Sequence, residues 1–190
     1  MQPTLVALFL ASTILGQEAI VSARIVGITD GDTVKALLAG NKLLRVRLTW
    51  IDAPEKSQAF GQRSKQHLSE LVFRRQVELH THGLDRYGRT LAVIFVNGMD
   101  ANLEQVRSGL AWVYERYVVQ AGADIQASYR QAETEAWEQQ RGLWSERDPI
   151  PPWGYRHAGK KSKLTGARLC ASLTLGTPFL GYTLYPDALS

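Results

Sequence analysis

The chain has 190 residues, a formal net charge of +4 and a hydrophobic fraction of 45%. This length allows one compact domain with extensions, and the composition is ordinary for a globular protein. The mild positive charge permits phosphate-bearing partners but does not predict them, because binding depends on where the charges are placed. A single cysteine, Cys170, excludes an intrachain disulfide and any zinc site built on several cysteines.

The first 23 residues have the features of an export signal. Residues 5–16 form an uncharged, mostly apolar run of 12 residues, which is short for a membrane span. Val21-Ser22-Ala23 follows, and this pattern of small residues suits signal peptidase, although no Lys or Arg precedes the apolar run. We therefore predict cleavage near Ala23 and export, to the periplasm or the medium. The alternatives are an uncleaved anchor or an N-terminal helix packed on the domain.

Short strands punctuated by turns dominate the part of the chain that follows. Strands are expected at residues 24–29, 32–38, 42–51, 76–82 and 89–96. From Leu44 to Trp50 apolar residues alternate with polar ones, and this period of two indicates a strand with one buried face.

Three helices are expected, at residues 57–76, 101–108 and 125–141, the last two followed by a glycine. Glu133, Glu135 and Glu138 are expected on the solvated face of the last of them. Three strands, a helix, two strands and terminal helices is the order of an OB-fold. The predicted class is therefore α+β, with a five-stranded barrel and about three helices.

Four clusters of polar and aromatic residues stand out, at residues 30–33, 47–55, 85–89 and 112–117. Taken singly, each has an ordinary structural explanation, such as a hairpin turn at Asp30-Gly31. Taken together, they supply the groups that cleavage of a phosphodiester requires.

The acidic residues of these clusters suit a metal and a base. Asp32 and Asp52, on adjoining strands, can supply the hard oxygen ligands that a divalent cation prefers. Such a cation polarises a phosphoryl oxygen and helps to hold the attacking water. Glu55 follows Asp52 by three residues, where it can orient or deprotonate that water. Arg47 and Arg89 are expected to contact the phosphate, because a guanidinium can bond two oxygens at once.

Three segments resemble the signature blocks of the staphylococcal nuclease homologues. They are residues 28–35 (Ile-Thr-Asp-Gly-Asp-Thr-Val-Lys), 47–55 (Arg-Leu-Thr-Trp-Ile-Asp-Ala-Pro-Glu) and 85–92 (Asp-Arg-Tyr-Gly-Arg-Thr-Leu-Ala). Residues 102–111 are similar to the family's following helix and residues 142–145 to the end of its last one. The similarity thus extends in register over residues 24–147. Residues 60–65 and 148–153 further resemble its exported bacterial and plasmid-borne branch.

The resemblance implies an OB-fold, calcium dependence, and hydrolysis of DNA and RNA that leaves 3′-phosphate ends. By matching position, Asp32, Asp52 and the main-chain carbonyl of Ala53 become calcium ligands. Asp30 would lie near the metal, just behind these ligands. Ala53 replaces a threonine that is usual in the family, so the carbonyl is kept while a hydroxyl hydrogen bond is lost.

The resemblance also assigns roles around the phosphate. Glu55 becomes the general base or water-orienting group, and Arg47 and Arg89 become the phosphate ligands. Tyr87 would contact a terminal phosphate, and Tyr117 would line the nucleotide pocket. A tyrosine often found two residues before the latter is replaced by a glutamate, whose carboxylate would repel a nearby phosphodiester.

The sequence therefore predicts a signal peptide at residues 1–23, a nuclease domain at 24–157 and a tail at 158–190 to which no function is assigned. The predicted function is a calcium-dependent endonuclease acting on single-stranded or otherwise accessible DNA and RNA, with no stable protein partner implied. The alternative is a non-catalytic OB-fold module that binds nucleic acid. Retention of all five central acidic and arginine residues favours the enzyme. A partner-binding or plasmid-maintenance role for the tail stays open.

Overall fold

The computed structural model describes residues 19–165, with side chains described as far as Ala158. Residues 1–18 of the predicted signal segment lie outside the described residues, as do residues 166–190 of the tail with Cys170. No helix in the described part of the chain is long and apolar enough to span a membrane.

The described residues form eight strands, five α-helices and two 3-10 turns. The strands are β1 (Ala19–Asp30), β2 (Thr33–Leu37), β3 (Leu43–Leu48), β4 (Ile51–Asp52), β5 (Gln76–Leu84), β6 (Thr90–Val96), β7 (Met99–Asp100) and β8 (Trp112–Val113). The α-helices are α1 (Gly61–Val72), α2 (Ala101–Arg107), α3 (Glu115–Val118), α4 (Ala123–Glu138) and α5 (Pro152–Thr165). Two short 3-10 turns are η1 (Ala39–Asn41) and η2 (Gly142–Ser145).

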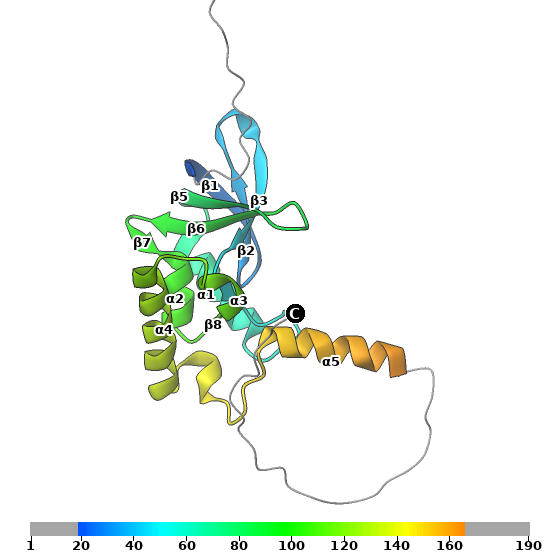
Figure 1. The fold of residues 1–190 in the computed structure, drawn as a ribbon. Coiled ribbons are helices and arrows are strands. Elements are labelled where there is room, and N and C mark those ends of the chain that lie inside the picture. The colour runs from blue at the N-terminus through cyan, green and yellow to red at the C-terminus, as the bar shows by residue number, and fades with distance from the viewer. Residues whose placement is uncertain (1–18, 166–190) are drawn as a thin grey trace, which may run out of the picture.

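Five strands form a closed barrel (Figure 1). Strand β1 pairs antiparallel with β2 and β5, β2 pairs with β3, and β5 pairs with β6. The barrel closes because β3 and β6 run parallel, from Val46↔Thr90 to Leu48↔Ala92. Closure joins the two outer strands and so protects edges that would otherwise be open to other chains. The predicted α+β class and five-stranded OB-type barrel are confirmed.

Strand β1 is longer than the sequence predicts. It begins at Ala19 rather than Arg24, and its first five residues pair with β5, from Ala19↔Thr81 to Ala23↔Val77. Ala23 is buried in the core, with 1% of its surface exposed. The run of small residues that suits signal peptidase also fits a tightly packed strand, so pattern alone does not separate the two. Cleavage immediately after Ala23 would remove these five pairings.

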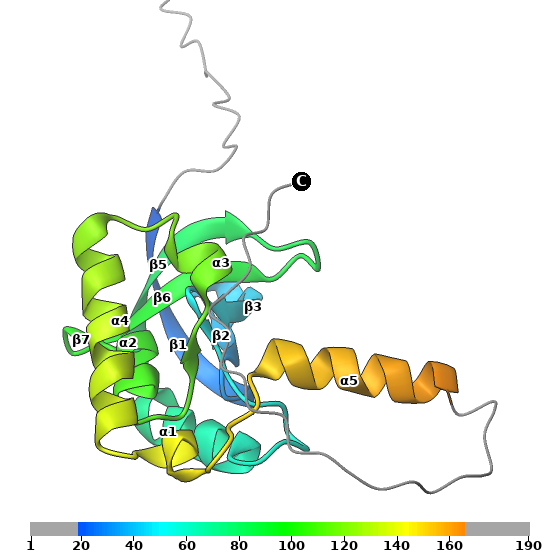
Figure 2. The same ribbon diagram turned by 60° about the horizontal axis from the view of Figure 1, so that its bottom comes forward.

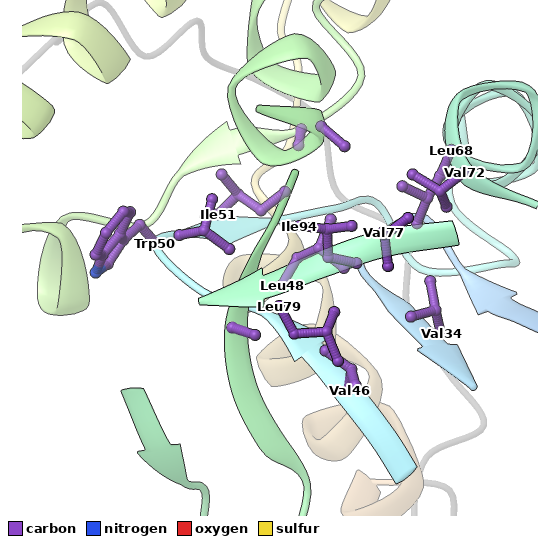
Figure 3. Close-up of a cluster of buried hydrophobic side chains, with 14 of the residues drawn as sticks. Val34, Val46, Leu48, Trp50, Ile51, Leu68, Val72, Val77, Leu79 and Ile94 are labelled. Carbon is purple, nitrogen blue, oxygen red and sulfur yellow. The ribbon is translucent and has the colours of Figure 1, made fainter. Parts of the chain in front are cut away.

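The barrel interior is the core predicted from the alternation in β3. Val46 and Leu48 are fully buried, together with apolar residues of the neighbouring strands. Helix α1 supplies Leu68 and Val72 to one end of this core, and Trp50 lies towards the other (Figure 3). Each fully buried aliphatic side chain contributes about 1.5–3 kcal/mol to stability relative to exposure.

The helices surround one side and one end of the barrel. Helices α2 and α4 pack side by side (Figures 1 and 2). Helix α1 begins at Gly61, later than predicted, because Phe60 has a left-handed φ of 64°. Elements β7, β8 and α3 are too short for a periodic pattern to reveal. Helix α5 crosses the predicted domain boundary at residue 157 and projects away from the barrel (Figure 2).

Two buried side-chain amides of α2, those of Asn102 and Gln105, hold the backbone at one end of the barrel, which we call the barrel mouth. Asn102 donates to the carbonyls of Thr49 and Ala92, both at 3.1 Å, and accepts from the N–H of Ile94 at 3.2 Å. Both Asn102 and Gln105 are fully buried. Since buried main-chain groups without partners are costly, these amides fix the segments they bridge.

The expectation that Glu133 lies on a solvated helix face is wrong. Its carboxylate accepts a hydrogen bond of 2.8 Å from the N–H of Val113, which turns it toward β8. Burial, with the nearby charge of Glu115, raises the pKa of Glu133 to about 7. The helix period alone does not reveal this contact, because β8 has only two residues and comes from elsewhere in the chain.

We predict that Glu133→Gln stabilises the protein at high pH only. Because the pKa of Glu133 is higher in the folded than in the unfolded protein, folding disfavours the charged carboxylate. This cost in stability is fully present above pH 7 and absent below pH 4.5. Glutamine keeps the acceptor for Val113 without the charge. The free energy of unfolding, from urea titrations, should rise by about 1–3 kcal/mol at pH 8.5 and stay unchanged at pH 4. The exposed Glu138→Gln is the control, and an equal effect at both pH values would contradict the prediction.

Candidate active site

The turn between β1 and β2 carries Asp30 and Asp32 to one end of the barrel. The N–H of Asp32 donates to the Asp30 carboxylate at 3.2 Å. Gly31 lies so close to α1 that an added Cβ would be 1.9 Å from the Ser64 hydroxyl oxygen. Gln105 donates to the Gly31 carbonyl at 2.7 Å. The two carboxylates are therefore set by a turn that only glycine fits and that α2 holds in place.

Arg47 lies between two buried carboxylates. Its Nη2 is 3.0 Å from Oδ2 of Asp32 and 2.9 Å from Oδ1 of Asp52, which are 6% and 1% exposed as residues. Its Nη1 donates to the carbonyls of Leu48 and Ile51, at 2.6 and 2.9 Å. Four acceptors thus fix the guanidinium, and the two predicted metal ligands converge on one nitrogen.

Ionisation is costly within this cluster. Burial raises the pKa of Asp30 to about 6, and the charge of Asp32 adds to the rise. Burial also raises the pKa of Asp52, while Arg156 and Arg47 oppose that rise. Crowded carboxylates of this kind are stabilised by any cation that enters among them.

The segment after β4 completes the surroundings of Asp32. The N–H of Ala53 donates to Oδ2 of Asp32 at 2.8 Å, and Thr33 donates its hydroxyl to Oδ1 at 3.1 Å. Glu55 follows Pro54, with its N–H directed to the side-chain oxygen of Gln58 at 3.2 Å. The β4–α1 loop therefore carries the predicted base beside the predicted ligands.

Arg89 reaches the same end of the barrel from the loop after β5. Its Nε donates to Asp85 at 2.7 Å, and its Nη1 donates to the Thr33 hydroxyl at 3.3 Å. Partial burial disfavours ionisation of Asp85, but hydrogen bonds from Arg89 and from the N–H of Tyr87 lower its pKa. The exposed Tyr87 ring lies 5.6 Å from the Arg89 guanidinium carbon. The Thr33 hydroxyl therefore links Arg89 to Asp32, because it accepts from the arginine and donates to the carboxylate.

The aromatic residues predicted to contact the nucleotide lie outside the acidic cluster. Tyr117 is 44% exposed, packs edge-on against Tyr114 and lines a groove of about 840 Å³ between the barrel and helices α3 and α4. Glu115, expected to repel a phosphodiester, is instead bonded to Arg130 at 2.9 and 2.8 Å. That ion pair offsets much of the expected repulsion.

Arg156 is the site residue that sequence analysis missed. Its Nη2 is 2.6 Å from Oδ2 of Asp52, and its Nη1 is 2.9 Å from the Glu55 carboxylate. No motif or periodic pattern marks it, because it lies on α5, beyond the segments that resemble a family. The predicted end of the domain also cut through this helix.

Within residues 19–165, no three or more His, Cys, Asp or Glu side chains are grouped so as to hold a metal ion. Asp32 and Asp52 supply two carboxylates, so a hard cation held by them needs main-chain or water oxygens in addition.

The fold and site define a class: an OB-barrel protein whose mouth combines buried carboxylates with arginines, a combination suited to phosphate esters. A family model described as staphylococcal nuclease homologue matches residues 45–146. The chain belongs to the staphylococcal nuclease homologue family.

Named relatives agree with this membership. The chain is 46% identical over 139 residues to an uncharacterized endonuclease of Haemophilus influenzae, covering 73% of this chain and 75% of that protein. It is 40% identical over 147 residues to a micrococcal nuclease of Shigella flexneri, covering 73% and 82%. It is also 40% identical over 138 residues to an uncharacterized endonuclease of Escherichia coli, covering 72% and 86%.

We predict strong coupling between Arg47 and Asp52 in a double-mutant cycle of Arg47→Gln and Asp52→Asn. Each single change removes one of two opposite charges from a buried group, leaving Asp52 with Arg156 alone or Arg47 with Asp32 alone, so the single variants should lose more stability together than the double variant does. Urea titrations at pH 7 should give a coupling energy of at least about 2 kcal/mol. The exposed pair Arg107–Glu104 is the control, where about 0–0.5 kcal/mol is expected. Additive effects at the first pair would show that the site does not depend on this contact.

Proposed function

We propose that the protein is a calcium-dependent nuclease that hydrolyses phosphodiester bonds of DNA and RNA and leaves 3′-phosphate ends. The observation that carries the proposal is the convergence of Asp32 and Asp52 on Arg47 at the barrel mouth, with Glu55 and Arg89 beside them. Membership of the family, and relatives named as endonucleases and a micrococcal nuclease, support the nuclease function.

The donor set fits a hard divalent cation. Oxygens of Asp32 and Asp52 already surround one positively charged nitrogen, and both carboxylates are almost fully buried. We assign these two side chains and the carbonyl of Ala53 as the calcium ligands. Asp30 adds negative charge behind them. Bound calcium would polarise a phosphoryl oxygen and help to position the attacking water.

The protein's own groups carry the remaining steps. Glu55 accepts a proton from the attacking water or orients it, because it lies on the loop next to the ligands. Arg47 and Arg89 bind the equatorial phosphate oxygens and offset the charge that gathers there. Tyr87, exposed beside Arg89, contacts a terminal phosphate. Tyr117 lines the groove for the base or sugar.

The proposal is tested by hydrolysis of single-stranded DNA and of RNA by the purified protein, with calcium, magnesium or a chelator. Cleavage should require calcium, and product ends should be 3′-phosphates by mass spectrometry. Glu55→Gln and Arg89→Gln should each lower kcat/KM by at least about 100-fold, because each removes a group used only in the transition state. Glu146→Gln and Arg147→Gln, exposed changes of the same kind, should not.

DNA binding without cleavage in any metal would contradict the enzyme and favour a non-catalytic OB-fold binding module. Cleavage that is equal with calcium and with chelator would contradict only the proposed calcium dependence, and the nuclease activity would stand.

We also propose that the protein is exported. The apolar run at residues 5–16 supports this proposal. Because β1 begins at Ala19, we expect a mature N-terminus that keeps most of the strand pairings with β5. Mass spectrometry of protein recovered from the periplasm or medium of expressing cells gives this N-terminus. Protein found only inside the cells with residues 1–18 intact would contradict export.

A further inference from the structure

Arg156 bridges the proposed metal ligand Asp52 and the proposed base Glu55. Its Nη2 lies 2.6 Å from Oδ2 of Asp52, while its Nη1 lies 3.3 Å from Oδ1 of Asp52 and 2.9 Å from Oε1 of Glu55. Oδ1 of Asp52 also contacts Arg47 at 2.9 Å. Both oxygens of this carboxylate are thus engaged by arginine, and the residue itself is only 1% exposed.

The start of α5 is anchored on both sides of the site, so the position of Arg156 is built into the fold. Trp153 stacks on Tyr114 with ring centroids 5.4 Å apart, and meets Trp112 edge-on at 5.8 Å. On the other side, the Tyr155 hydroxyl lies 3.0 Å from the hydroxyl of Ser57, in the β4–α1 loop. These contacts join α5 both to β8 with the residue that follows it and to the loop that carries the base, and the helix then runs outward (Figure 2).

A guanidinium and a divalent cation need the same oxygens of Asp52. Two cations a few ångströms apart repel each other strongly in a partly buried site. The Arg156 side chain is 41% exposed, so it can turn into solvent while Trp153 keeps the helix attached. Arg47 has no such freedom, because four acceptors hold it and its side chain is 13% exposed.

We propose that Arg156 is a positioning residue that holds Asp52 and Glu55 in the metal-free site and competes with the divalent cation for Asp52. This inference rests on the proposed function, since it takes Asp52 as a metal ligand. Metal binding and the contact of Arg156 with Asp52 are then linked, and each weakens the other by the same factor. Helix α5 thereby sets the metal concentration at which the site fills.

The test is calorimetric titration of calcium into the full-length protein without nucleic acid. Arg156→Gln removes the competing charge and should bind calcium at least about tenfold more tightly than the natural protein. Arg156→Lys keeps a cation there and should stay closer to the natural affinity. Arg147→Gln, an exposed loss of the same charge beyond the site, should change the affinity less than about twofold. Thermal unfolding with calcium is a second readout, and calcium should raise the Tm most in Arg156→Gln.

Two results would overturn the inference, and they differ in what else they affect. Unchanged or weaker calcium binding in Arg156→Gln, with normal binding in the natural protein, would refute competition and leave the proposed function intact. Absence of calcium binding in all four proteins would refute both, because Asp52 would then not be a calcium ligand.

Discussion

The burial of like charges at one end of the barrel is the constraint that organises the site. Asp32 and Asp52 are almost removed from water, and two carboxylates so placed repel each other unless a cation lies between them. Arg47 supplies that cation and in addition bonds two main-chain carbonyls. The site is therefore stable as a set of paired charges rather than as separate groups.

The scaffold holds this charge arrangement from three directions. The parallel pairing of β3 with β6 closes the barrel and brings the start of β6, just after Arg89, beside the end of β3. The α2 amide Gln105 bonds the carbonyl of Gly31 between the two turn carboxylates. The segment after β4 directs the N–H of Ala53 to Asp32. Each contact joins segments distant in sequence, so the site exists only when the barrel is closed.

Much of this arrangement could be predicted from the chain. Alternation in β3 predicted its buried face, and turn residues separated the strands of the barrel. The clusters containing Asp32, Arg47 and Asp52 were recognised as a set because their order and spacing resemble a known family. The two-residue strands β4, β7 and β8 and the four-residue helix α3 escaped, because a periodic pattern needs more residues than they contain. The contact of Glu133 with β8 could not be predicted either, because β8 itself is too short to be recognised in the sequence.

The sequence by itself determined the OB-type barrel and the identity of the candidate chemical groups, because local periodicity and motif spacing are properties of neighbouring residues. Only the tertiary structure decided which charges meet. Arg156 contacts a carboxylate more than a hundred positions earlier, at Asp52, through a helix anchored by Trp153 and Tyr155. Such a contact depends on the path of the whole chain around the barrel, and no local pattern encodes it.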